Sequence, residues 1–390
     1  LTKVPVFSKI TSAFQSLKPR VSYGVTGRSD FDAYRSMPTY SSNGSYFINN
    51  QWVTGFAPSS NANPSLGWEK SKAFNIGVDF AMLNSRLRGS VEYFNRKSED
   101  LLYSYTAPQP PYVWNSILVN VGTTENTGFE VVLDYDVFSK NAFKWTTGVN
   151  YSYGTTKLSK LSNDIYKASY VDLYLKPGVG TSEYFFRIQE GGKIGQFYGY
   201  KYAGTDENGN MLIYNNDSEA IPVSQADASF KRYIGNGAPP HFLSWNNFFS
   251  YRNWDLSFQF RGAFGFEIFN MRKYGMGLQL SGTDNILRSA YLEDKDLKTG
   301  GGVISSYFLE KGDYLKLDNL TLGYTFTPKN RKLVENLRVY LAAKNIFTLT
   351  GYKGNDPSIV TSTGITPGVD SNSAYPTATQ MSIGITMKFH

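Results

Sequence analysis

The sequence lacks cysteine altogether and contains only two histidines, His241 and His390. Without thiols the chain can form neither a disulfide framework nor a thiolate metal site. Two histidines, one of them terminal, are too few for a multi-histidine metal centre and give little support to a histidine-based catalytic triad. We therefore predict that the protein is not an enzyme and requires no metal or cofactor.

Long apolar runs are also missing, because no segment approaches the roughly 18 to 20 apolar residues that a membrane-spanning helix requires. The net charge of +7 comes from lysines and arginines that are scattered along the chain. They form no basic stripe, so nucleic acid is not expected as a partner. Residues 1–20 contain no initiator methionine, basic region or apolar core of a signal peptide. We expect the chain to be a piece of a longer exported polypeptide.

Aromatic residues, in contrast, are abundant, with 29 tyrosines and 27 phenylalanines among 390 residues. Such a content is high for a soluble domain and usual for a membrane barrel with aromatic girdles. The clearest pattern lies in residues 379–389, TQMSIGITMKF, where apolar side chains alternate with polar or small ones. This period of two predicts a strand with one apolar and one polar face.

The same pattern recurs in nine further segments and predicts ten long strands. Turns of about three to ten residues alternate with connections of roughly 25 to 80, so all long loops lie at one end. Two short helices are expected at 8–17 and 284–292. Lipid offers no hydrogen-bond partner, so a membrane sheet must close on itself, and we predict an all-β, transmembrane antiparallel barrel. The ten strands are expected at 18–27, 68–80, 87–93, 127–137, 143–153, 242–251, 254–264, 313–326, 337–347 and 379–389.

Nine segments, taken in order, resemble the C-terminal part of the SusC/RagA family of TonB-dependent outer-membrane transporters from Bacteroidetes. Each segment alone is a generic hairpin sequence, whereas nine in this order are specific and extend over essentially the whole chain. They are LKPRVSYGVTG (17–27), NPSLGWEKSKAFNIGVDF (63–80), RLRGSVEYFNRKSEDLL (86–102), NVGTTENTGFEVVLDY (120–135), GGKIGQFYGYKYAGTDENG (191–209), YIGNGAPP (233–240), GDYLKLDNLTLGYTF (312–326), LRVYLAAKNIFTLTGYKGNDP (337–357) and the terminal strand.

The resemblance implies a 22-stranded barrel with an N-terminal plug domain in its lumen, of which residues 1–390 supply the last ten strands. It implies import of a large nutrient, a glycan or an oligopeptide, across the outer membrane. The implied partners are a SusD-like surface lipoprotein, a TonB complex, the rest of the barrel with its plug, and outer-membrane lipid. Residues 158–240 would form a long extracellular loop, and the short turns would be periplasmic. Family members end on an aromatic residue, so we interpret His390 as a tag remnant or a native addition after Phe389.

Two other classes of protein remain alternatives to this transporter. One is a free-standing ten-stranded outer-membrane barrel, either a passive pore or an enzyme with its site on the loops. The other is a soluble β-rich protein, such as a sandwich, a propeller or a glycan-binding module. The substrate cannot be named from the sequence, because specificity in the resembled family is expected in the loops and plug.

Six polar residues are predicted to project into the lumen of the barrel, which is too wide for side chains to fill. One interpretation is that they hydrate the lumen and bind the plug through salt bridges. The other is that they line the path of the substrate. The six residues are Arg88, Glu92, Glu130, Asp134, Gln259 and Arg261.

Candidate ligand contacts are also found in the predicted loops. Tyr112 and Trp114, flanked by proline and asparagine, can stack on a sugar ring or a peptide side chain, or can instead pack within the loop or anchor an interface. Residues 206–210 (DENGN) resemble a calcium loop, but Met211 replaces the expected glycine and no glutamate closes the loop. We therefore predict an ordinary turn at this position.

Overall fold

The computed structural model describes residues 13–29, 31–139, 142–162, 167–175, 183–278, 285–293, 296–298, 300, 302–328, 334–358, 364–370, 375 and 377–389. The interpretation of His390 as a tag remnant lies outside the described residues. Within them, no helix is long and apolar enough to cross a membrane.

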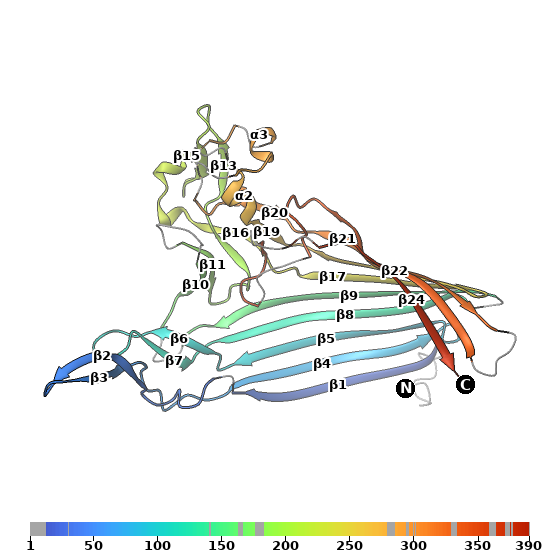
Figure 1. Ribbon diagram of the computed structural model, residues 1–390, viewed down its shortest axis with the longest axis horizontal. Helices are drawn as coiled ribbons and strands as arrows, with labels where there is room; N and C mark the ends of the chain where they lie inside the picture. The colour runs from blue at the N-terminus through green and yellow to red at the C-terminus, as the bar shows by residue number, and fades with distance from the viewer. Residues whose placement is uncertain are drawn as a thin grey trace.

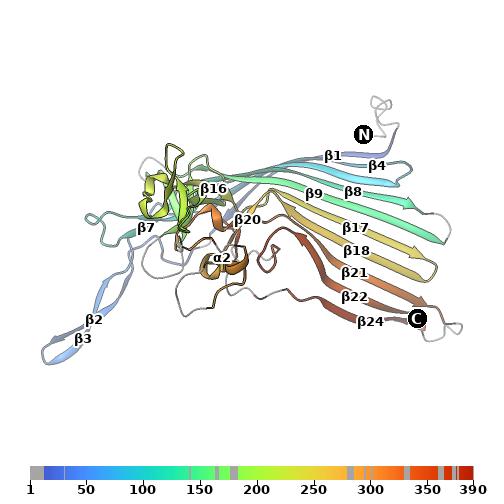
Figure 2. The ribbon, with the colours of Figure 1, turned by 90° about the horizontal axis from the view of Figure 1, so that it is seen from above.

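Ten long antiparallel strands form one curved sheet, in which the order of the strands is their order along the chain (Figures 1 and 2). All ten strands predicted from the sequence are present, which confirms the all-β antiparallel fold. They are β1 (Phe14–Arg28), β4 (Glu69–Met82), β5 (Leu87–Glu99), β8 (Thr123–Phe138), β9 (Phe143–Lys160), β17 (His241–Tyr251), β18 (Trp254–Phe264), β21 (Tyr314–Phe326), β22 (Val334–Thr350) and β24 (Gln380–Phe389).

The sheet is open, because β1 pairs only with β4 and β24 only with β22 among the strands described. It therefore has the form of part of a barrel wall and not of a closed ten-stranded barrel. The predicted helix at 8–17 is wrong where the structure describes it, since Phe14 and Ser16 pair with β4 as part of β1. The helix predicted at 284–292 is reduced to α3 (Ser289–Leu292), a single turn.

The outward face of the sheet is apolar and aromatic, as the period of two predicts. On β18 the outward residues include Phe258 and Phe260, and the ring of Trp245 on β17 stacks on Phe260 with centroids 5.8 Å apart. On β24, Ile383 is 78% exposed. Apolar side chains this exposed fit contact with lipid, where they meet hydrocarbon instead of water.

Two ion pairs on the inward face join strands that are not neighbours, and each crosses the intervening strand at a glycine. Arg20 on β1 reaches Glu92 on β5 at 3.0 Å, and both residues lie in one row with Gly77 of β4. Arg338 on β22 donates to Asp255 on β18 at 2.9 Å, above Gly323 of β21. A Cβ atom at Gly323 would lie 2.6 Å from both charged groups, so the glycine leaves room for the ion pair.

Replacing Gly323 with alanine should therefore lower the free energy of unfolding by about 1 to 3 kcal/mol, the usual range for overpacking. The measurement is the temperature at which the folded full-length protein converts to its heat-denatured form on a gel. Gly154 on β9 is the matched control, because a Cβ there would meet its nearest atom at 3.4 Å. Equal losses in the two variants would contradict this role of Gly323.

The last three long connections fold together into a lobe, defined as the described parts of residues 161–240, 265–311 and 351–370. Figures 1 and 2 show it at the end of the sheet opposite to the start of β1 and the end of β24. Its strands are β10 (Tyr170–Leu175), β11 (Tyr184–Gln189), β12 (Gln196–Gly199), β13 (Tyr202–Thr205), β14 (Met211–Tyr214), β15 (Ala220–Pro222), β16 (Arg232–Asn236), β19 (Glu267–Asn270), β20 (Leu309–Lys311) and β23 (Val369–Asp370), with α2 (Met271–Met276) and α3 between them.

The lobe has a hydrophobic core of its own, and all three connections contribute to it. The rings of Phe185 and Phe269 lie 4.6 Å apart, and β23 of the third connection pairs in parallel with β19 of the second. Residues 158–240, expected as a loop, thus begin within β9 and continue as folded structure. The main core residues are Phe185, Phe186, Phe197, Met211, Ile213, Phe269, Ile304, Phe308 and Val369.

The first two long connections each contain a hairpin. β2 (Tyr40–Ile48) and β3 (Gln51–Pro58) extend away from the sheet, at the left of Figure 1. β6 (Leu102–Thr106) and β7 (Ser116–Asn120) enclose a small core with Val119 and Val121. All the long connections leave the same end of the sheet because the strands alternate in direction.

Candidate functional site

The six predicted lumen residues share the inward face of the sheet. The register sets Arg88 of β5 opposite Asp134 of β8, and Glu92 of β5 opposite Glu130 of β8. The row of Asp134 continues through Gly148 and Asn246 to Gln259 of β18, and Arg261 lies two residues further along the same face. Directly opposed residues in a sheet point to the same side, so the predicted alternation holds across β5, β8 and β18.

Two of these residues, both on β5, are bound by other residues of the sheet. Arg88 binds both carboxylate oxygens of Asp136, at 2.8 and 3.2 Å. The carboxylate of Glu92 lies 3.0 Å from Arg20. Because these charges are neutralised inside the sheet, they have less capacity to bind a plug than the sequence alone suggests.

The two predicted residues on β18 also have partners inside the wall. Arg261 lies 3.0 Å from the carboxylate of Asp318, which sits at the bulge of β21. The amide of Gln259 donates to Ser244 and accepts from Asn319, both at 3.1 Å. These contacts tie β18 to β17 and β21.

Glu130 and Asp134 differ from the other four residues. Neither carboxylate has a hydrogen bond or an ion pair to another residue in the described part of the chain. Glu130 stands opposite Glu92, which repels it. Asp134 stands opposite Arg88, whose guanidinium is already bound to Asp136. These two carboxylates are therefore free to bind a group in the lumen.

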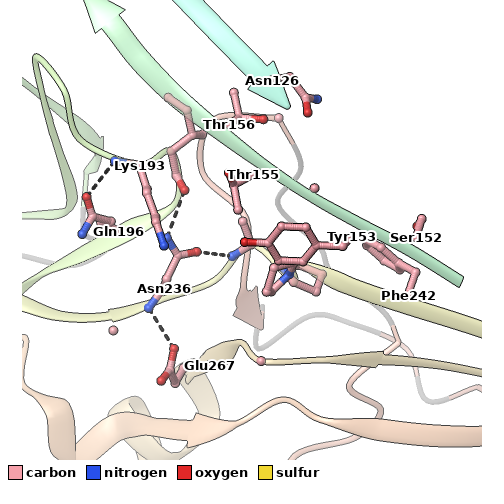
Figure 3. A pocket seen from close by; sticks show the side chains of 18 of the residues that line it. Asn126, Ser152, Tyr153, Thr155, Thr156, Lys193, Gln196, Asn236, Phe242 and Glu267 are labelled. Carbon is pink, nitrogen blue, oxygen red and sulfur yellow. Dashed lines mark hydrogen bonds between the residues drawn. The ribbon is translucent and has the colours of Figure 1, made fainter. Parts of the chain in front are cut away.

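Three cavities lie along the inward face beside these carboxylates. The first, of about 670 Å³, lies between the wall and the lobe (Figure 3). Glu130 is one of its lining residues. The second, of about 460 Å³, shares Glu130, Ser152 and Phe242 with the first. The third, of about 490 Å³, is lined by Asp134 and Phe248.

The lobe side of the first cavity is held by a network of hydrogen bonds around Asn236. Its amide donates to the carbonyl of Ile194 at 3.1 Å and accepts from the backbone of Ala238 at 2.7 Å. Its backbone N–H donates to Glu267 at 2.8 Å, as Figure 3 shows. Asn236 is not among the residues predicted from the sequence, although it lies within YIGNGAPP, one of the segments that carry the resemblance.

Phe242 and Phe248 on β17 are further lining residues that were not predicted from the sequence. They are 48% and 46% exposed and point inward, since their partners Ser152 and Thr146 lie on the polar face of β9. Two phenylalanines at even spacing within a polar face are the signal that could have identified them.

The loop candidates Tyr112 and Trp114 have different environments. Trp114 is 43% exposed, and its backbone is fixed by Asn61, whose side chain makes four hydrogen bonds to residues 113–116. Tyr112 packs on the core of the β6–β7 hairpin. Neither lines the three cavities, and their binding of substrate stays a prediction.

Residues 206–210 form a turn whose acidic group is already satisfied. The carboxylate of Asp206 accepts from the side chain of Asn210 and from the backbone N–H groups of Asn208 and Asn210. These bonds, the one from the Asn210 side chain foremost, lower the pKa of Asp206. Across the described ranges, no group of three or more histidine or acidic side chains could hold a metal ion.

Comparison with known proteins places these features in a family. Residues 9–346 match the sequence profile described as TonB dependent receptor-like, beta-barrel. The chain is 28% identical to TonB-dependent receptor P3 of Formosa agariphila, over 98% of the chain and 40% of that protein. It is 27% identical to TonB-dependent receptor SusC of Bacteroides thetaiotaomicron, over 98% of the chain and 38% of that protein. The RagAB peptide importer in its closed-closed state is similar at a TM-score of 0.78 and 25% identity, over 98% of this chain and 42% of that one. The chain thus spans about two fifths of the length of these relatives.

Proposed function

Since this chain belongs to the TonB dependent receptor-like β-barrel family, we propose that it is the C-terminal part of a transporter that imports a large nutrient, driven by a TonB complex. It is an outer-membrane β-barrel chain, and the SusC/RagA relationship predicted from the sequence is confirmed. The relatives are named as receptors and importers, in agreement with the prediction that the protein is not an enzyme.

The open sheet is the observation that carries this proposal. Its outward face is apolar, its inward face is polar, and the outer edges of β1 and β24 are unpaired among the described strands. Unpaired edges in lipid leave backbone groups unsatisfied, each at a cost of several kcal/mol. Further strands of a 22-stranded barrel would satisfy both edges, and a plug would fill a lumen of that width.

The long connections would then be extracellular, including residues 158–240, and a SusD-like lipoprotein would cap them. The β2–β3 hairpin is a suitable contact for such a partner. Trp52 and Phe56 on it are 73% and 70% exposed, and residues 36–68 contain no charged side chain. A lone two-stranded hairpin is only marginally stable in water, so cover by another protein would stabilise it. The cargo would be a glycan or an oligopeptide.

The test replaces residues 40–58 with a short linker in the full-length protein. We expect the lipoprotein to be lost from the purified complex and growth on the imported nutrient to fall, while heat-modifiability shows an intact barrel. A variant shortened at residues 215–218, in an exposed turn of the lobe, is the control and should retain the lipoprotein. Growth on glycans and on oligopeptides as sole nutrients separates the two classes of cargo. If deletion of the whole gene changes growth neither on glycans nor on oligopeptides, the proposed import function is wrong.

A further inference from the structure

The charged residues of the inward face fall into two zones. On β1, β4 and β5, Arg20 pairs inside the sheet with both Asp79 and Glu92, each at 3.0 Å. On β8 the carboxylates of Glu130 and Asp134 have no such partner in the described part of the chain. A solute that passes beside Arg20 meets neutralised pairs, whereas one that passes along β8 meets free carboxylates.

The three cavities lie along β8, one after another from the lobe toward the short turns. Glu130 and Asp134 are four residues apart on one face of β8, about 13 Å at the rise of a strand. Phe242 and Phe248 on β17 are six residues apart, about 20 Å, and run beside them with β9 between. The first and second cavities contain Glu130 with Phe242, and the third contains Asp134 with Phe248. Each cavity therefore offers a carboxylate and an exposed aromatic ring.

One other polar group on these cavities, on Asn126, favours a ligand that donates hydrogen bonds. The side-chain oxygen of Asn126, in the first cavity, is buried and has no partner among the described residues. Lys193 lines the same cavity from the lobe. Arg261 lines the second cavity and is paired with Asp318. In the third cavity Asp134 is the one charged side chain among the described lining residues.

We propose that this strip, formed by β8, β9 and β17 with the residues Glu130, Asp134, Phe242 and Phe248, is the path of the imported solute and binds its ammonium or guanidinium groups. A carboxylate accepts hydrogen bonds from such a cation, and the adjacent ring attracts the cation and covers its aliphatic stem. The inference rests on the proposed import function and adds the chemical groups that the path selects.

The experiment measures binding to the full-length transporter with two matched pairs of probes. One pair is an oligopeptide with free lysines and its lysine-acetylated form, and the other is a glucosamine oligomer and its N-acetylated form. Calorimetry gives the ratio of Kd between the acetylated and the free member of each pair. In the Glu130→Gln/Asp134→Asn double variant this ratio should fall about tenfold in the pair that the transporter binds, as expected when a hydrogen bond to a charged group is removed. Asp79→Asn is the matched control, since Asp79 lies on the inward face of β4, away from β8, and is bound by Arg20, and the ratio should not change.

The outcomes separate the imported solute from another source of cationic groups, the plug. If basic residues of the plug occupy Glu130 and Asp134, the double variant should admit vancomycin into cells and leave the Kd ratio unchanged, which overturns the proposal. An unchanged ratio without leakage, or a wild-type protein that prefers the acetylated probes, overturns it as well. Failure of import itself would appear separately, as unchanged growth after deletion of the gene.

Discussion

Replacing Asp356 with alanine should detach the connection that carries it from the barrel wall and destabilise their contact by about 3 to 5 kcal/mol, the cost of breaking a buried ion pair. Lys316 on the inward face of β21 is 1% exposed, and its ammonium lies 2.8 Å from Asp356. Ser358 is a second partner at 3.2 Å. Without Asp356 the ammonium would remain buried and uncompensated, so the connection that carries Asp356 should separate from β21.

The same ion pair predicts how the contact depends on pH. Burial raises the pKa of Asp356, but hydrogen bonds from Lys316, Thr377 and Ser358 outweigh it and hold the pKa at about 2. A carboxyl whose pKa is lower in the folded state stabilises that state at pH values above its ordinary pKa, which is 3.8 for Asp356. The stabilisation should therefore be complete at neutral pH and be lost as the pH falls from about 4 through 2.

Limited proteolysis of the folded full-length protein measures detachment, with heat-modifiability as the control for the barrel. Asp356→Ala should expose residues 351–370 to cleavage. The Lys316→Met/Asp356→Leu double variant should be far less sensitive, because replacing both charges removes the uncompensated ion. Glu293→Ala, which removes a solvent-exposed partner of Lys353, should behave as wild type. Equal protection of all three variants would contradict the role of the buried pair.

The strands of the wall were predictable because their apolar period is sustained over many residues. The prediction for β9 ended at residue 153, whereas the strand continues to Lys160. Beyond Tyr153 the residues GTTK no longer alternate between apolar and polar, so the period gives no signal there. The backbone nevertheless continues to pair with β8, which shows that pairing outlasts the apolar pattern.

The lobe could not be predicted, because its core joins residues far apart in the sequence. Phe185, Phe269 and Val369 come from three different connections, and none of the three lies in a long periodic segment. Their burial depends on the wall, which brings the ends of the strands together. Only the existence and the position of the long connections were accessible from the sequence.

The candidate site was predictable in part. Period two alone placed Arg88, Glu130 and Asp134 on one face. It could not show that Arg88 binds Asp136 diagonally and leaves Asp134, its direct neighbour, without a partner. Such pairings depend on the register between strands, which sequence alternation does not contain.

Replacing Phe258 with arginine should lower the stability of the barrel by about 2 to 4 kcal/mol, because charge near the centre of the bilayer is costly. Phe258 is on the outward face near the middle of β18. Its ring lies 5.8 Å from Trp245 and 6.0 Å from Phe249. The substitution therefore both removes aromatic packing and places a cation in hydrocarbon.

Two control variants separate these effects in a heat-modifiability titration of the full-length protein. Phe258→Leu loses the aromatic contacts but stays apolar, so the difference between Leu and Arg isolates the cost of charge in lipid. Gln259→Arg changes the next residue, which points inward and bonds to Ser244 and Asn319. Its cost should be about 1 kcal/mol, since it loses hydrogen bonds and remains in a polar lumen. Equal tolerance of arginine at 258 and 259 would mean that both faces of β18 meet the same medium, and the assignment of the outward face to lipid would be wrong.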